Sequence, residues 1–88
     1  MEKTSDKLNA AERRSLKDSD FGIPSLREFP MPDAVHVRAA EAYFRYASNE
    51  NKPLLAHRIL LKAKKFGVDV ESDTVRDWAK RYKENGKE

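Results

Sequence analysis

The segment from Asp18 to Asp33, DSDFGIPSLREFPMPD, constrains the fold of this chain more than any other stretch. Its prolines at positions 24, 30 and 32 prevent a continuous helix and favour extended backbone at the residues before them. The segment also carries large apolar side chains that need burial, namely Phe21, Ile23, Leu26, Phe29 and Met31. We therefore expect an ordered extended segment, called the strap below, laid across a small helical core.

Hydrophobic periodicity predicts helices on both sides of the strap. A short one spans residues 10–16, and the three main ones span residues 34–47, residues 53–66 and a stretch that begins at residue 72, 73 or 74 and ends at 84. Four local signals set their ends: a capping box of Asn9 with Glu12, an N-cap at Asp33, Pro53 in a first turn, and a C-cap at Gly67.

Two of the main helices differ in how their apolar residues are arranged. Residues 34–47 are apolar around more than half of the helix, whereas the last helix has one narrow stripe around Trp78. We expect Trp78, Tyr43 and Tyr46 to pack in the core. The alternative for the two tyrosines is stacking on bases or anchoring a protein partner.

These elements predict an all-α fold: a small bundle of three main helices plus a short N-terminal helix, wrapped by the strap. The length of 88 residues allows one domain, which we place at residues 9–84, with a disordered tail at 1–8 and a frayed tail at 85–88. No cysteine is present, so stability must come from packing or from oligomerisation rather than from disulfides. No apolar stretch approaches the roughly 20 residues that span a bilayer, and we expect no membrane association.

The sequence offers little for catalysis, and we expect no enzyme activity, metal or cofactor. His36 and His57 lack the spaced partners of a metal site, and a contact between His36 and Asp33 that settles the helix start explains the first of them better. The serines stand at turn or cap positions, and no glycine-rich phosphate loop exists.

Charge is distributed unevenly along the chain. Residues 1–51 carry 8 basic and 9 acidic side chains, whereas residues 52–88 carry 10 and 6. The basic half gives an alternative function, in which the last two helices form a loose helix-turn-helix that binds nucleic acid. Six residues would then contact a nucleic acid or an acidic partner: Lys62, Lys64, Lys65, Arg76, Lys80 and Arg81.

The strap and its flanks resemble a short uncharacterised domain of bacteriophage and prophage proteins. The shared pattern reads ER..LPDSDFGIP..R.YP..D..HVR.A, followed by a basic helix that ends in KFG. Matching residues are Glu12, Arg13, Leu16, Asp18, Ser19, Phe21, Gly22, Ile23, Pro24, Arg27, Pro30, Asp33, His36, Val37, Ala40, Phe44, Phe66 and Gly67. The chain departs from the pattern at Lys17, which replaces a proline, and at Phe29, which replaces a tyrosine.

This resemblance implies a phage-encoded or prophage-encoded origin and no catalytic residues. Domains of this kind are often attached to phage structural or head-maturation proteins, which places them in the host cytoplasm or the virion. We therefore expect a non-catalytic protein-interaction or virion-associated module with a phage or host protein as its partner. Arg27, Asp33 and His36 would form one polar cluster where the strap meets the next helix, either as a structural lock or as a partner-binding patch.

Overall fold

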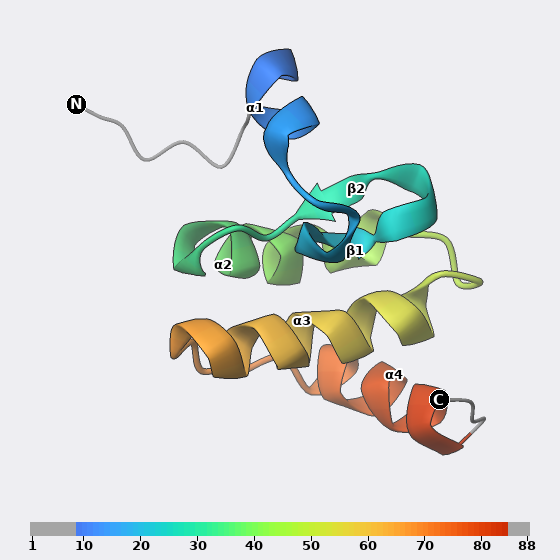
Figure 1. Cartoon of the computed structure of the whole chain (residues 1–88). Coiled ribbons are helices and arrows are strands. Elements are labelled where there is room, and N and C mark those ends of the chain that lie inside the picture. The colour runs from blue at the N-terminus through green and yellow to red at the C-terminus, as the bar shows by residue number, and fades with distance from the viewer. Residues whose placement is uncertain (1–8, 85–88) are drawn as a thin grey trace.

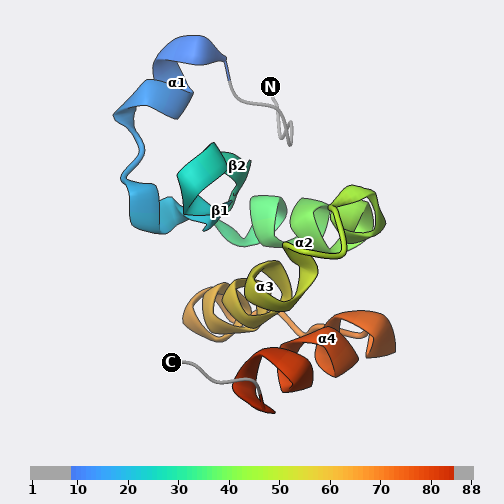
Figure 2. The same cartoon turned by 90° about the vertical axis from the view of Figure 1, so that its right-hand side faces the viewer.

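The computed structural model describes residues 9–84, so the predicted tails at 1–8 and 85–88 lie outside it. The regular elements are α1 (Ala10–Ser15), β1 (Phe21–Ile23), β2 (Glu28–Pro30), α2 (Ala34–Tyr43), α3 (Lys52–Phe66) and α4 (Asp73–Glu84). Three short 3-10 turns accompany them: η1 (Asp18–Asp20), η2 (Pro24–Leu26) and η3 (Phe44–Tyr46). Helix α3 lies in the middle, with α2 and the strands on one side and α4 on the other (Figure 1 and Figure 2).

The strap contains a two-stranded antiparallel sheet, so the prediction of an all-α fold is wrong. Strands β1 and β2 pair with Phe21 opposite Pro30 and Ile23 opposite Glu28. Pro24 starts the turn η2 in the first helical position, and Arg27 then takes a left-handed conformation with φ of 50°. The prolines that exclude a long helix therefore allow a tight reversal, and the two extended arms pair with each other.

Most of the strap's apolar side chains are buried, as predicted. Phe21, Ile23 and Met31 are inaccessible to solvent or nearly so, and Phe29 packs against the core from its edge. Leu26 is an exception with 53% exposure, because it lies in η2 at the outer end of the hairpin. The strap thus supplies part of the hydrophobic core.

Three of the predicted helix ends have the expected cap geometry. Asn9 accepts a hydrogen bond from the Glu12 amide at 2.8 Å, and the Glu12 carboxylate accepts one from the Asn9 amide at 2.9 Å. Asp33 accepts from the His36 amide at the start of α2. Gly67 ends α3 with φ of 71°, a conformation that glycine adopts without a steric penalty. Short-range sequence signals therefore set these boundaries.

Helix α2 buries only one of its two apolar stripes. Val37, Ala40 and Phe44 lie in the core. Tyr43 and Tyr46 are 49% and 70% exposed, so the prediction that they pack in the core is wrong. Trp78 is partly buried and packs against the core, as expected. The outer stripe of α2 is left at the surface.

The connector between α3 and α4 is held to the rest of the domain at several points. Val68 and Val70 are buried, and the Glu41 carboxylate of α2 accepts hydrogen bonds from the amides of Glu71 and Ser72 at 3.0 and 2.9 Å. Helix α4 then runs back beneath α3 in the opposite general direction (Figure 1). Across residues 9–84, no helix is long and apolar enough to cross a membrane.

Candidate functional site

Arg27 joins the strap to α1. Its guanidinium donates to the Asp18 carboxylate, to the Arg13 carbonyl at 2.8 Å and to the Leu16 carbonyl at 3.2 Å. It also lies over the Phe21 ring, 4.5 Å from the ring centre. Arg13 returns a hydrogen bond to the Arg27 carbonyl. Helix α1 buries no side chain, so this exchange of hydrogen bonds is its main attachment.

The predicted cluster of Arg27, Asp33 and His36 is divided in the structure. Among the described residues, no hydrogen bond or ion pair links Arg27 to either of the other two. Asp33 and His36 do meet, with His36 Nδ1 2.6 Å from Asp33 Oδ1. Burial alone would raise the pKa of the Asp33 carboxyl, but the hydrogen bonds from the His36 side chain and amide outweigh it and lower that pKa.

His36 also lines a small pocket between α2 and β2. Its imidazole is buried, and its Nε2 is the one buried side-chain nitrogen or oxygen without a hydrogen-bond partner in the described part of the chain. The pocket has a volume of about 70 Å³. Phe29 forms one wall in a left-handed conformation with φ of 59°, which is unusual for a bulky residue. Strained backbone of this kind is found mainly at functional sites.

The same pocket borders the exposed stripe of α2. Tyr43 lines it and pairs with Tyr46 at a distance of 6.4 Å between ring centres. Val35 is exposed one turn before Ala39 of the pocket wall, and the guanidinium of Arg45 lies over the Tyr46 ring. We call Val35, Tyr43, Arg45 and Tyr46, with the adjoining pocket, the tyrosine face.

The six basic residues predicted to contact a partner do not share one surface role. Lys62 turns inward, where its amine lies 3.8 Å from the Asp20 carboxylate and its side chain is 12% exposed. Loss of hydration lowers the pKa of Lys62, and the nearby charge of Lys65 lowers it further, against the opposing effect of Asp20. Lys62 therefore helps to hold η1 against α3.

The other five basic residues are exposed on α3 and α4. Lys65 lies over the Phe66 ring and Arg81 over the Trp78 ring, at 5.4 and 4.4 Å from the ring centres. In such stacking the cation already has a partner inside the chain, and it covers one face of the aromatic ring. The remaining three, Lys64, Arg76 and Lys80, line a groove between the two helices.

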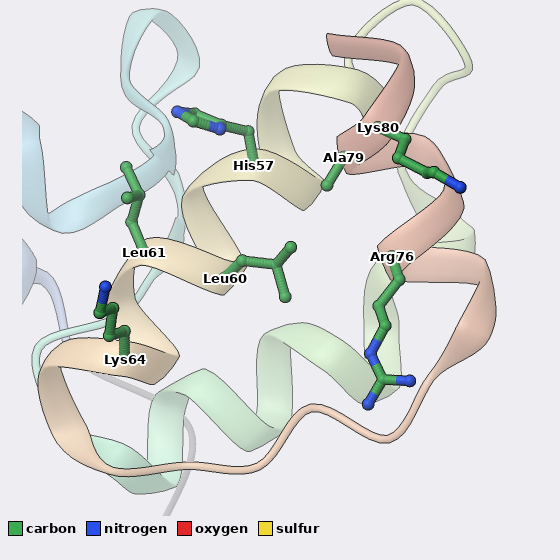
Figure 3. Close-up of a pocket in the computed structure, with 7 residues that line it drawn as sticks. All are labelled: His57, Leu60, Leu61, Lys64, Arg76, Ala79 and Lys80. Atoms are coloured by element: carbon green, nitrogen blue, oxygen red, sulfur yellow. The ribbon is translucent and has the colours of Figure 1, made fainter. Parts of the chain in front are cut away.

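This α3–α4 groove has a volume of about 330 Å³ and is the larger of the two pockets described here. In Figure 3, Leu60 and Ala79 point into the space between the helices, and the three charged ends lie at its edge in different directions. Leu61 extends the apolar surface and is 52% exposed. His57 completes the lining and stacks on Tyr82, with 4.5 Å between ring centres.

Metal-ligating and nucleophilic side chains are sparse around the His36 pocket. Within residues 9–84, no three histidine or acidic side chains are placed to hold a metal ion. The only histidine–carboxylate pair described is that of His36 and Asp33, and its pocket contains no serine or lysine that could act as a nucleophile.

Two residues with important contacts were missed by sequence reasoning. Arg58 donates to the Phe21 carbonyl at 2.8 Å and to the Ser19 carbonyl, and so ties the strap to α3. Glu41 holds the α3–α4 connector. Their partners are backbone groups more than 25 positions away, so no local motif marks them. The only sequence signal for these contacts was a charged residue next to a stripe of apolar residues.

Comparison with known proteins adds one finding. The model of a protein family described as a family of unknown function (DUF6582) matches residues 2–73, which include α1, the strap, α2 and α3. No curated protein and no solved structure matches the chain. Since the match spans most of its length, the chain belongs to the DUF6582 family of unknown function.

Proposed function

We propose that this chain is a non-catalytic protein-interaction module that binds a partner protein through the tyrosine face. The observation that carries the proposal is the exposure of two neighbouring tyrosine rings on α2 and η3. Tyrosine and arginine are enriched at the centres of protein interfaces, because they combine a large apolar area with a polar end. The adjoining pocket gives the face a hollow that a partner side chain can enter.

The proposal includes a bacteriophage or prophage origin, with the protein acting in the host cytoplasm or the virion. Its support is the resemblance of the strap to the phage-associated pattern described above. Several residues of that pattern have internal structural roles in this chain, such as Asp18, Phe21 and Arg27 around the α1 attachment. The pattern therefore specifies how the strap folds, and partner binding falls to other side chains, including Tyr43 and Tyr46.

The experiment compares capture of proteins from phage-infected or lysogenic cells by two purified variants and the unmodified chain. The test variant is Tyr43→Ala with Tyr46→Ala, which shortens the two exposed rings. The matched control is Leu26→Ala, which removes a side chain of similar exposure from the far end of the hairpin. Quantitative mass spectrometry measures the enrichment of each captured protein.

We expect a defined partner that the unmodified chain and the Leu26→Ala control enrich equally and that the double tyrosine variant loses. Circular dichroism should show all three proteins equally folded, since exposed side chains contribute little to stability. Equal capture of the same partner by the double tyrosine variant would refute the role of the tyrosine face. Absence of any specific partner, in a chain that stays monomeric, would refute the interaction module itself.

A further inference from the structure

The α3–α4 groove has a charge pattern that differs from the rest of the molecule. The chain as a whole contains 18 basic and 15 acidic residues, yet none of the seven residues that line the groove is acidic. The side-chain amines of Lys64 and Lys80 make no hydrogen bond or ion pair with any residue between 9 and 84. Arg76 is already engaged through both terminal nitrogens of its guanidinium, one on the Asp73 carboxylate and the other on the Val70 carbonyl.

The floor of the groove is apolar. Leu60 and Ala79 point into the space between the helices, and half-exposed Leu61 also lines the groove, next to Lys64 on the side of α3 that is away from α4 (Figure 3). A large aliphatic side chain left half exposed beside an apolar hollow gains free energy when another apolar group covers it. The volume of about 330 Å³ is at the lower end of the range of ligand sites.

Together, these features select the chemistry of an occupant. The cationic ends lie at separate points of the edge and point in different directions, so they do not converge on one phosphate or carboxylate (Figure 3). An extended or helical segment with several acidic side chains can reach all of them while its apolar side chains enter the hollow. A nucleic acid would place its phosphates at the edge, but it has no flexible aliphatic side chain that can enter the hollow between Leu60 and Ala79.

We infer that the α3–α4 groove is a second docking site, which binds an acidic segment of a partner protein through leucine-type side chains on its floor and carboxylates at its edge. This site is separate from the tyrosine face, because it lies between α3 and α4 rather than between α2 and β2. A chain with both surfaces can bring two protein segments together.

The test uses synthetic probes and the purified full chain, so it does not depend on the partner of the tyrosine face. The first probe is a blocked hexapeptide of four glutamates and two leucines, in the order Glu-Leu-Glu-Glu-Leu-Glu. The second replaces both leucines by alanine, and the third replaces all glutamates by lysine. A labelled DNA oligonucleotide is the fourth. Binding is measured by fluorescence polarisation at low and at physiological salt.

We expect the glutamate–leucine peptide to bind about tenfold more tightly than its alanine version, because burying the two leucines adds to the charge attraction. The lysine version should not bind. Lys64→Glu with Lys80→Glu should abolish binding, whereas Arg14→Glu with Lys17→Glu, an equal charge change on exposed residues outside the groove, should leave it unchanged.

Three results would overturn the inference. Equal binding of the leucine and alanine peptides would show attraction by charge alone. Tighter binding of the oligonucleotide, with affinity that falls by orders of magnitude between about 50 and 200 mM salt, would indicate the nucleic-acid alternative. Unchanged peptide binding by the Lys64→Glu, Lys80→Glu variant would show that the peptide binds outside the α3–α4 groove. Circular dichroism checks that each variant is folded.

Discussion

Gly22 and Leu55 should be strongly coupled, because at Gly22 the strap lies directly against the Leu55 side chain of α3. A β-carbon added at Gly22 would lie 3.1 Å from the Phe29 β-carbon and 3.2 Å from the Met31 ε-carbon, against an ordinary contact range of 3.4–4 Å. It would come still closer to a δ-carbon of Leu55, which is fully buried. Gly22→Ala therefore overpacks the core, and we expect a loss of about 2 kcal/mol in the free energy of unfolding.

Leu55→Val removes the δ-carbons that cause the worst of these overlaps. On its own it should cost about 1.5 kcal/mol, from one lost methylene, a small cavity and the lower helix propensity of valine. Independent effects would add to about 3.5 kcal/mol in the double variant. We expect about 2 kcal/mol instead, since the new methyl group at position 22 fills the space that the shorter side chain leaves.

Urea unfolding followed by far-ultraviolet circular dichroism measures the four proteins of this cycle, with the slope m as a check that the unfolded states are alike. A coupling of about 1.5 kcal/mol corresponds to a difference of roughly 6–12 °C in Tm for a domain of this size. Additive losses would refute the reasoning, because they would mean that the strap does not press against Leu55. A stabilised Gly22→Ala variant would refute it equally.

Three further predictions concern single residues. Asp33 has a lowered pKa, so its contribution to stability is present above the ordinary value of 3.8 and is lost as the pH falls through the folded pKa. In urea unfolding between pH 3 and 6, the free energy of unfolding of Asp33→Asn, which keeps the cap, should therefore fall less steeply with decreasing pH than that of the unmodified chain. The same dependence on pH in both proteins would contradict this. Trp78→Ala should cost about 3 kcal/mol, whereas Tyr46→Ala should cost less than about 0.5 kcal/mol, and equal Tm values for the two variants would show that Trp78 is not part of the core. Arg27→Lys loses the forked hydrogen bonds to the Arg13 and Leu16 carbonyls. Amide hydrogen exchange should therefore become faster in α1 and stay unchanged in α3. If the α1 amides are as protected as in the unmodified chain, Arg27 does not hold α1 in place.

Much of the fold follows from local sequence. The helix ends were predictable because caps such as Asn9 and Gly67 act within four residues of the chain. The buried stripe of α3 was predictable because only one of its faces is continuously apolar around Ile59. These features depend on spacing alone.

The features that sequence reasoning missed depend on how distant elements are placed. The β1–β2 pair is only three residues long on each side, and its hydrogen bonds give no periodic signal in a segment rich in proline. Helix α2 has two apolar stripes, so spacing could not tell which one faces α3, and the exposure of Tyr43 and Tyr46 could not be foreseen. The α3–α4 groove required the relative position of two helices joined by an irregular connector.

Helix α4 supplies one wall of the α3–α4 groove, yet apart from Asp73 it lies outside the residues that match the family model. The strap, the His36 pocket and the wall of the groove that α3 supplies all lie inside that match. Conservation of the matched scaffold would therefore not fix the side chains on the α4 wall. In this chain, replacing the outward residues of α4 would change which segment the proposed docking groove prefers. The contacts that hold the rest of the domain together would stay the same.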